Sequence, residues 1–221
     1  MPASARRLIR EYHRRLSFRR AIARSADAIA VGELPAEQVA ALSYGWGNEG
    51  FSAETGFLSA VVRRAAAVTG PILECGSGLS TVLLSIATRE TGREVWSLEN
   101  DPQWAERVRK SLRDERARAT YVETAPLKNY GAFDWYEPNF SRLPRQFSLV
   151  VCDGPPGHTH GGRYGLVPVM REHFAPGCVI LVDDAERDAE RLIAERWAKE
   201  LNATLEFEGR ERGLGVLTLP A

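Results

Sequence analysis

Residues 71–81 combine an acid, two glycines and three hydroxyl side chains in a pattern that can hold a nucleotide-like ligand. Glu74 lies in a short apolar run, Gly76-Ser77-Gly78 follows it, and apolar residues then recur at helical spacing. This pattern predicts a buried strand, a tight turn and a helix. Glycines let the backbone approach a ligand closely, and the first N–H groups of the helix point into the same space. We therefore expect a cofactor site at this turn.

The spacing of the turn departs from two common nucleotide-binding motifs. A dinucleotide fingerprint needs a third glycine three residues after Gly78, where the chain has Thr81, and a Walker loop needs Gly-Lys-Ser/Thr, which is missing. Thr81 therefore disfavours a nicotinamide cofactor. What remains is an acid, two glycines, Ser80-Thr81 and a second acid, Glu99, which lies 25 residues after Glu74 and closes a second apolar strand.

This remaining pattern resembles the class I S-adenosylmethionine-dependent methyltransferases, whose first motif is E/D-x-G-x-G and whose second strand ends in an acid. In that family the glycine turn lies against the methionine and ribose part of the cofactor. The resemblance implies that Glu99 binds both ribose hydroxyls, because one carboxylate can accept two hydrogen bonds from a vicinal diol. A solvated strand-end carboxylate is the alternative. The cofactor-binding residues implied around the turn are Glu74, Gly76, Ser77, Gly78, Ser80, Thr81, Glu99 and Asn100.

Two further segments enter the cofactor site by resemblance. Residues 43–52 join glycines to large aromatic side chains, which suggests a loop that becomes ordered by packing on something. In the family the segment before the first strand folds over the cofactor, so we expect Trp46 and Asn48 to act as a lid, with ordinary core packing as the alternative. The residues just after the third strand flank the adenine there, which would bring Thr124 and Ala125 near it.

Acids also follow the fourth and fifth predicted strands, 147–152 and 177–182. Asp153 follows the first of these strands, and Asp183 and Asp184 follow the second. The resemblance implies the strand order 3-2-1-4-5-7-6, in which these strands are neighbours, so the three carboxylates converge at the edge where open α/β sheets bind ligands. Three such carboxylates repel one another, and the site must take up a proton or a cation.

Oxygen ligands of this kind suit magnesium, manganese or calcium rather than zinc. We therefore predict that Asp153, Asp183 and Asp184 bind a divalent metal, which would stabilise the acceptor oxygen as its proton leaves. The arrangement looks like that of the catechol-type O-methyltransferases, from which the chain departs in its Gly-Pro-Pro-Gly loop and in Asp184, where they have asparagine. In the alternative, Asp183 or Asp184 caps the next helix, and Asp153 supports the cofactor or acts alone as the base.

The glycine-rich loop after Asp153 carries further candidates. Arg163 and its neighbour Tyr164 could anchor an acidic acceptor. His158 or His160 could act as a general base near neutral pH. An exposed, mobile loop without a role in the reaction is the alternative.

The same loop bears on the class of acceptor. Methyltransferases that act on the amino groups of bases carry Asp/Asn-Pro-Pro and an aromatic after strand four, where the aromatic stacks on the flipped base. This chain has Asp-Gly-Pro-Pro-Gly at 153–157, so we expect a hydroxyl on a small-molecule or sugar-like acceptor rather than nucleic acid. Five aromatic residues in 124–146 could form the acceptor pocket or a small satellite core. Two rival functions stay open: a nicotinamide-dependent oxidoreductase, and a non-catalytic cofactor-binding scaffold that works through the N-terminal arm.

The elements that position these residues are expected to form one α/β domain, for which 221 residues suffice. Residues 51–221 are predicted to be the methyltransferase domain, a Rossmann-like sheet of seven strands whose last strand is antiparallel. Residues 1–50 are predicted to be a basic helical arm followed by the lid segment.

The helix of this arm, predicted over 4–30, has an apolar stripe of Leu8, Tyr12 and Leu16. Residues 1–24 carry eight arginines against one acid. The arginines could contact phosphate, an anionic lipid surface or an acidic polymer. We favour instead a helix docked on its own domain or on a second copy of the chain, which would form a homo-oligomer.

Composition sets the remaining limits. The 29 basic and 29 acidic residues balance, so the charge of the whole chain predicts no partner. No apolar run approaches the roughly 18 residues of a membrane span, and no apolar signal core follows Met1, from which we expect a cytoplasmic location. The three cysteines fall in or beside predicted core strands, which is typical of small buried thiols.

Overall fold

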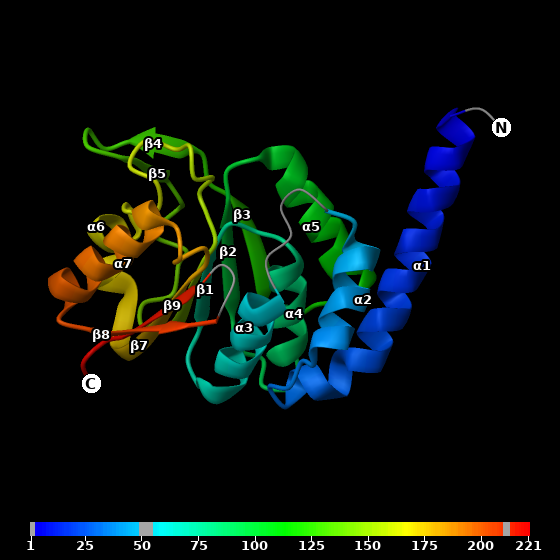
Figure 1. Cartoon of the computed structure of the whole chain (residues 1–221), viewed down its shortest axis with the longest axis horizontal. Helices are drawn as coiled ribbons and strands as arrows, with labels where there is room; N and C mark the ends of the chain where they lie inside the picture. The colour runs from blue at the N-terminus through cyan, green and yellow to red at the C-terminus, as the bar shows by residue number, and fades with distance from the viewer. Residues whose placement is uncertain (1–2, 49–54, 210–212) are drawn as a thin grey trace.

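A mixed sheet of seven strands runs through the middle of the protein (Figure 1). The structure is a computed structural model that describes residues 3–48, 55–209 and 213–221. In their order across the sheet, the strands are β3 (Thr120–Thr124), β2 (Val95–Glu99), β1 (Ile72–Cys75), β6 (Phe147–Cys152), β7 (Phe174–Val182), β9 (Leu214–Thr218) and β8 (Thr204–Glu208). The pairs from β3 to β7 are parallel, and β9 runs antiparallel to both of its neighbours. The predicted order 3-2-1-4-5-7-6 with an antiparallel last strand is thereby confirmed.

Helices cover both faces of this sheet (Figure 1). One face carries α1 (Ala3–Ala30), α2 (Ala36–Trp46), α3 (Thr55–Ala67), α4 (Leu79–Ala87) and α5 (Pro102–Asp114). The other carries α6 (Leu166–Met170), the short 3-10 helix η1 (Arg171–His173), α7 (Asp188–Leu201) and a hairpin of β4 (Leu127–Asn129) and β5 (Asp134–Tyr136). Successive strand residues point to opposite faces, so Ile72 of β1 joins the first core and Leu73 the second. Burial on both sides explains why the central strands read as continuous apolar runs.

Two predictions about the segments that flank the sheet need correction. Residues 43–46, predicted to be part of a glycine-rich loop, form the last turn of α2, which ends where Gly47 adopts a φ of 72°. Positions 49–52 of the same predicted loop lie outside the described residues. β7 begins at Phe174, three residues before the predicted start of the fifth strand.

Three of the five aromatic side chains of the segment 124–146 belong to the core. Phe133, Trp135 and Tyr136 are all buried and join the core between the sheet and the helices α6 and α7. The alternative of a satellite core therefore describes this segment better than an open acceptor pocket does, although Tyr136 also reaches the cavity described below.

The long first helix docks on its own chain through its second half. Phe18, Ile22 and Ile29 are buried there, and α2 lies so close that a Cβ at Gly45 would come within 2.6 Å of the Phe18 Cα. Tyr12 is instead 63% exposed, so the predicted stripe through this residue is not the docking face. The first turns of α1 extend beyond the rest of the molecule (Figure 1). Among the described residues, no helix is both long and apolar enough to cross a membrane.

This difference between the two halves of α1 can be measured. We expect Phe18→Ala to lower the free energy of unfolding by about 3 kcal/mol, because it removes a buried ring that packs against Trp46. Tyr12→Ala, the control on the exposed half, should change it by less than about 0.5 kcal/mol. Denaturant titrations of both variants give the two values, and equal small effects would show that α1 is not docked through Phe18.

Candidate functional site

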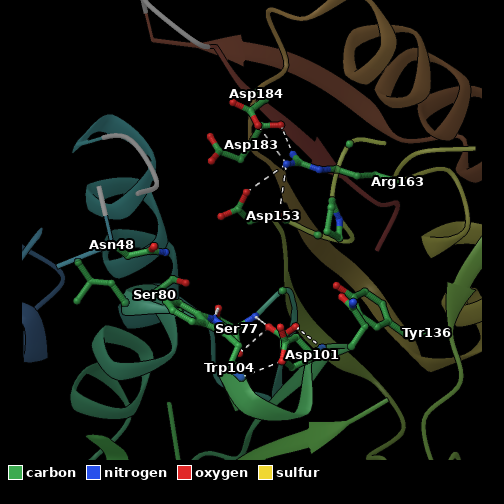
Figure 2. Close-up of a pocket in the computed structure, with 18 of the residues that line it drawn as sticks. Asn48, Ser77, Ser80, Asp101, Trp104, Tyr136, Asp153, Arg163, Asp183 and Asp184 are labelled. Atoms are coloured by element: carbon green, nitrogen blue, oxygen red, sulfur yellow. Dashed lines mark hydrogen bonds and ion pairs between the residues drawn. The ribbon is translucent and has the colours of Figure 1, made fainter. Parts of the chain in front are cut away.

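The carboxyl ends of four neighbouring strands open into a cavity of about 640 Å³ (Figure 2). Each strand contributes to its lining: Gly76 follows β1, Glu99 ends β2, Asp153 follows β6 and Asp183 follows β7. This is the edge at which open α/β sheets bind their ligands. The helices complete the walls, to which Trp46 of α2 and Trp104 of α5 contribute.

The glycine turn after β1 has two different glycines. Gly76 has a φ of 89°, and a Cβ there would lie 3.1 Å from the backbone nitrogen of Gly154, so this position needs glycine for the fold. Gly78 has extended backbone, and a Cβ there would meet no atom within 4 Å. Because Gly78 also lines the cavity, its missing side chain leaves room for a ligand at the start of α4.

Glu99 ties this turn to the end of β2. Its Oε2 accepts hydrogen bonds from the Ser77 backbone nitrogen at 3.0 Å and from the Ser77 hydroxyl at 2.8 Å. Its Oε1 accepts from the Asp101 backbone nitrogen at 2.9 Å. Since each carboxylate oxygen has two lone pairs, Oε1 can accept a further bond from a diol in the cavity, whereas both lone pairs of Oε2 are taken up by Ser77. Glu99 is 6% exposed, which argues against the alternative of a solvated strand-end acid.

Glu74 and Thr81 lie beneath the turn and outside the lining of the cavity. Glu74 is fully buried, and its Oε2 accepts from the Thr81 hydroxyl at 2.6 Å and from the Ser97 hydroxyl at 2.5 Å. The Thr81 Oγ1 in turn accepts from the Gly78 nitrogen at 2.8 Å. Burial raises the pKa of Glu74 to about 7. These residues, predicted to bind the cofactor, support the turn from below.

Three carboxylates and one guanidinium meet at the ends of β6 and β7 (Figure 2). One ligand atom from each of Asp153, Asp183 and Asp184 lies within 4.8 Å of the others, so the predicted convergence is confirmed. The Arg163 Nη2 lies 3.1 Å from Asp153 Oδ1 and 3.2 Å from Asp184 Oδ2, and its Nη1 donates to the Asp183 carbonyl. Arg187 at the surface adds an ion pair of 2.9 Å to Asp184 Oδ2.

The electrostatics of this cluster follow from its burial. Arg163 is only 3% exposed. Burial raises the pKa of Asp183 above the usual range of aspartate, and repulsion from Asp153 and Asp184 adds to the shift. Burial works against the charge of Arg163 as well, but the surrounding acids outweigh it and raise the pKa of its guanidinium. The cation that three converging acids require is thus supplied by the chain itself.

Arg163 also affects whether the three acids can bind a divalent metal ion. Such a metal would lie about 2.0 to 2.6 Å from its oxygen ligands. Two of the three acids, Asp153 and Asp184, already direct an oxygen at the Arg163 guanidinium. A metal bound to them would lie beside a buried like charge. With Arg163 in this position, the residues present do not fit a divalent metal.

The remaining predicted residues divide into two groups. Lining the cavity are Trp46, Asn48, Ser77, Ser80, Asn100 and His158. Outside the lining, Ala125 is fully buried, and the Thr124 hydroxyl accepts from Arg109 Nη2. His160 is exposed, 3.9 Å from Asp134, and the Tyr164 hydroxyl bonds to Arg196 and Glu200 of α7.

Several lining residues were missed by the sequence analysis, among them Ser43, Asp101, Trp104, Tyr136 and Arg187. Trp104 is the most informative, because its Nε1 donates to the Ser77 carbonyl at 2.7 Å and its ring lies 6.2 Å from that of Trp46. The sequence did offer a signal for Trp104, because this tryptophan lies in the first turn of the helix that follows the strand-end acid Glu99. Tyr136 was predicted only as one of five aromatics that could form a pocket, and Ser43 only as part of the lid segment.

A family model described as a methyltransferase domain matches residues 73–185, more than half of the chain. This match covers the glycine turn, Glu99 and all three acids of the cluster. None of the curated proteins matches the chain.

Solved structures share the fold. The SAH-bound methyltransferase PaMTH1 of Podospora anserina is 15% identical, covers 88% of each chain and has a TM-score of 0.63. The O-methyltransferase of Bacillus cereus in complex with SAH is 13% identical, over 83% of this chain and 90% of that chain, with a TM-score of 0.57. The ribosomal protein L11 methylase of Lactobacillus delbrueckii is 12% identical, over 79% and 80%, with a TM-score of 0.52. At these identities the likeness is one of fold alone.

Because Glu74 is buried beneath the turn, we expect the stability of the protein to depend on pH. The pKa of Glu74 is about 7 in the folded protein, whereas its ordinary value is 4.5. The folded protein therefore binds this proton more tightly than the unfolded chain does. The free energy of unfolding should fall as the pH rises from about 4.5 to about 7. Relative to Glu74→Gln, the wild type should lose about 3 kcal/mol of unfolding free energy across this window. Denaturant titrations along a pH series measure the difference. Glu94→Gln, which changes an exposed acid directly before β2, serves as the control, and equal slopes for wild type and Glu74→Gln would contradict the assignment.

Proposed function

The chain belongs to the methyltransferase-domain family, and on that premise we propose that it transfers the methyl group of S-adenosylmethionine to a hydroxyl group of a small-molecule or sugar-like acceptor. The observation that carries this proposal is the cavity at the carboxyl edge of the sheet, where an open glycine turn, Glu99 and the acid cluster face one space. SAH, the product that S-adenosylmethionine leaves after methyl transfer, is bound by two of the proteins with the same fold.

The turn and β2 supply the groups that the cofactor needs. Gly78 leaves space beside the first N–H groups of α4, which suits the methionine part of the cofactor. Glu99 Oε1 keeps a lone pair for one ribose hydroxyl, and Oε2 would accept the other once the Ser77 hydroxyl rotates away from it. Trp46 and Trp104, which stand edge to face, would close the same side of the cavity over the cofactor. Thr124 and Ala125 have no part in this proposal, because neither lines the cavity.

Asp153 is the best candidate for the base. When bound, S-adenosylmethionine supplies an electrophilic methyl group on a sulfonium. The acceptor's hydroxyl proton would pass to the Asp153 carboxylate as the acceptor oxygen bonds to the methyl carbon and the bond from that carbon to sulfur breaks. Burial raises the pKa of Asp153 above its usual range, which makes this carboxylate a better base than an exposed one. His158, which is exposed at the cavity wall, is the second candidate.

The acceptor class is supported by the groups around Asp153. The loop at 153–157 places glycines and prolines, and no aromatic ring, where an extruded base would need a stacking partner. A hydroxyl acceptor needs a base, and the acid cluster offers one at the cavity wall. A small hydroxylated molecule therefore fits the site better than nucleic acid does.

Ligand binding tests the proposal and separates it from its rivals. We expect isothermal calorimetry to show binding of SAH but not of a nicotinamide dinucleotide, and labelled S-adenosylmethionine to transfer methyl groups to a member of a pool of small hydroxylated compounds. Gly78→Ala should fold normally and lose SAH binding, since its added methyl group would occupy the open space of the turn. Binding of the dinucleotide in place of SAH would favour an oxidoreductase. SAH binding without turnover on any pool would favour a non-catalytic scaffold.

The role of Glu99 gives a sharper prediction. Glu99→Ala should weaken SAH binding by about 1.5 to 3 kcal/mol, the value of hydrogen bonds to a charged group. Glu94→Ala removes an exposed acid at the other end of the same sheet strand and is the matched control, with unchanged affinity expected. Calorimetry with each variant measures the loss. An affinity of Glu99→Ala equal to that of the wild type would remove Glu99 from the cofactor site.

A further inference from the structure

We propose that Arg163 takes the place of a divalent metal in this site, so that methyl transfer, the proposed function on which this inference rests, proceeds without a metal. Three features of the Arg163 guanidinium support this role: its position, its contacts and its burial.

The guanidinium of Arg163 joins the ends of two neighbouring strands. Its Nη2 contacts Asp153 Oδ1 after β6 at 3.1 Å and Asp184 Oδ2 after β7 at 3.2 Å. Its Nη1 donates to the carbonyls of Asp183 and of Cys152, the latter at 3.4 Å. A metal held by the three acids would bridge the same two strand ends. Arg163 therefore already makes the link that the metal would make.

The burial of Arg163 leaves little room for both cations. Its side chain is only 4% exposed, so water screens its charge poorly. A divalent metal within bonding distance of Asp153 and Asp184 would lie a few ångströms from this guanidinium, and the two positive charges would repel. Leaving the site would also cost Arg163 its contacts with two carboxylates and three carbonyls, and a buried charge without partners is strongly disfavoured.

The charge balance of the cluster points the same way. Its three acids carry at most three negative charges, and Arg163 and Arg187 supply two positive charges within 3.2 Å of their oxygens. A divalent cation in addition would leave the buried cluster with a net positive charge. The chain's own arginines thus meet most of the demand for positive charge that led to the metal prediction.

This arrangement assigns Arg163 a positioning role in the reaction. It fixes one oxygen of Asp153 by an ion pair, while Asp153 lines the cavity and its side chain keeps 29% exposure. The other oxygen is then the one available to accept the proton of the acceptor's hydroxyl. In a metal-dependent site that oxygen would be a ligand instead, and the metal would polarise the acceptor.

Manganese binding tests this role without any need for turnover. Electron paramagnetic resonance titration with Mn²⁺ should detect no stoichiometric site in the wild type. Arg163→Gln removes the buried charge and leaves all three acids in place, so we expect Mn²⁺ to bind it at least tenfold more tightly than the wild type. The double variant Arg163→Gln/Asp184→Asn should lose this site again. Arg191→Gln, which removes an exposed arginine of α7 that does not line the cavity, is the charge-matched control and should bind no Mn²⁺.

Turnover, once an acceptor is known, adds a readout that a purely structural arginine would not change. Wild-type turnover should be the same in excess chelator and in added Mg²⁺ or Mn²⁺, whereas either metal should restore part of the activity that Arg163→Gln loses.

Two results would overturn the proposal. One is a single Mn²⁺ site in the wild type that Asp184→Asn abolishes, together with loss of turnover in chelator. The other is the absence of Mn²⁺ binding in both the wild type and a folded Arg163→Gln, because the guanidinium would then not be what excludes the ion. If Arg163→Gln does not fold, the wild-type titration still decides between the metal and the arginine. A failure to bind SAH would refute the proposed function instead and would leave the Mn²⁺ result readable.

Discussion

The buried guanidinium of Arg163 is the interaction on which the rest of this site depends. Three acids at the ends of two adjacent strands would repel one another in a region with little water, and the protein could hold them there only by binding protons or a cation. Arg163 provides that cation from within the loop that follows β6, at 3.1 and 3.2 Å from two of the acids. The loop, the acids and the wall of the cavity are therefore fixed together, and none of them is independent of the others.

The opposite wall is built on hydrogen bonds and aromatic packing. Glu99 holds Ser77 of the glycine turn, and Trp104 donates to the carbonyl of the same residue. The guanidinium of Arg107 lies over both tryptophan rings, 4.6 Å from the centre of the Trp104 ring and 5.1 Å from that of Trp46. Trp46 lines the cavity and packs on Phe18 of the first helix, so the docking of that helix helps to hold this wall of the cavity in place. The N-terminal helices thus contribute to the shape of the site as well as to the core.

The fold could be read from the sequence because its signals are local. Apolar runs of four to six residues, each followed by an acid or a glycine turn, gave the parallel strands, and the resemblance supplied their order. The convergence of Asp153, Asp183 and Asp184 followed from that order alone. The sequence was less informative where a residue's partners are distant in the chain. Arg163 looked like an acceptor anchor, because no pattern shows that a glycine-rich loop folds back beneath two strand ends.

Other errors share this cause. Tyr12 fits a helical stripe as well as Phe18 does, and only the close approach of Gly45 on α2 selects the face that docks. Glu74 and Thr81 have the spacing of a cofactor motif, yet they bond to each other beneath the turn, where Ser97 of the neighbouring strand completes their contacts. Propensity and motif spacing locate an element, whereas packing between elements decides which of its side chains reach the ligand.

A crystal structure of the wild-type protein with SAH, grown with excess chelator, tests the central claim most directly. The account predicts SAH in the cavity at the carboxyl edge, with its ribose hydroxyls on the two oxygens of Glu99 and its homocysteine part against Gly78, while Arg163 still contacts Asp153 and Asp184. SAH bound elsewhere on the chain, or bound in this cavity without contact to Glu99, would contradict it.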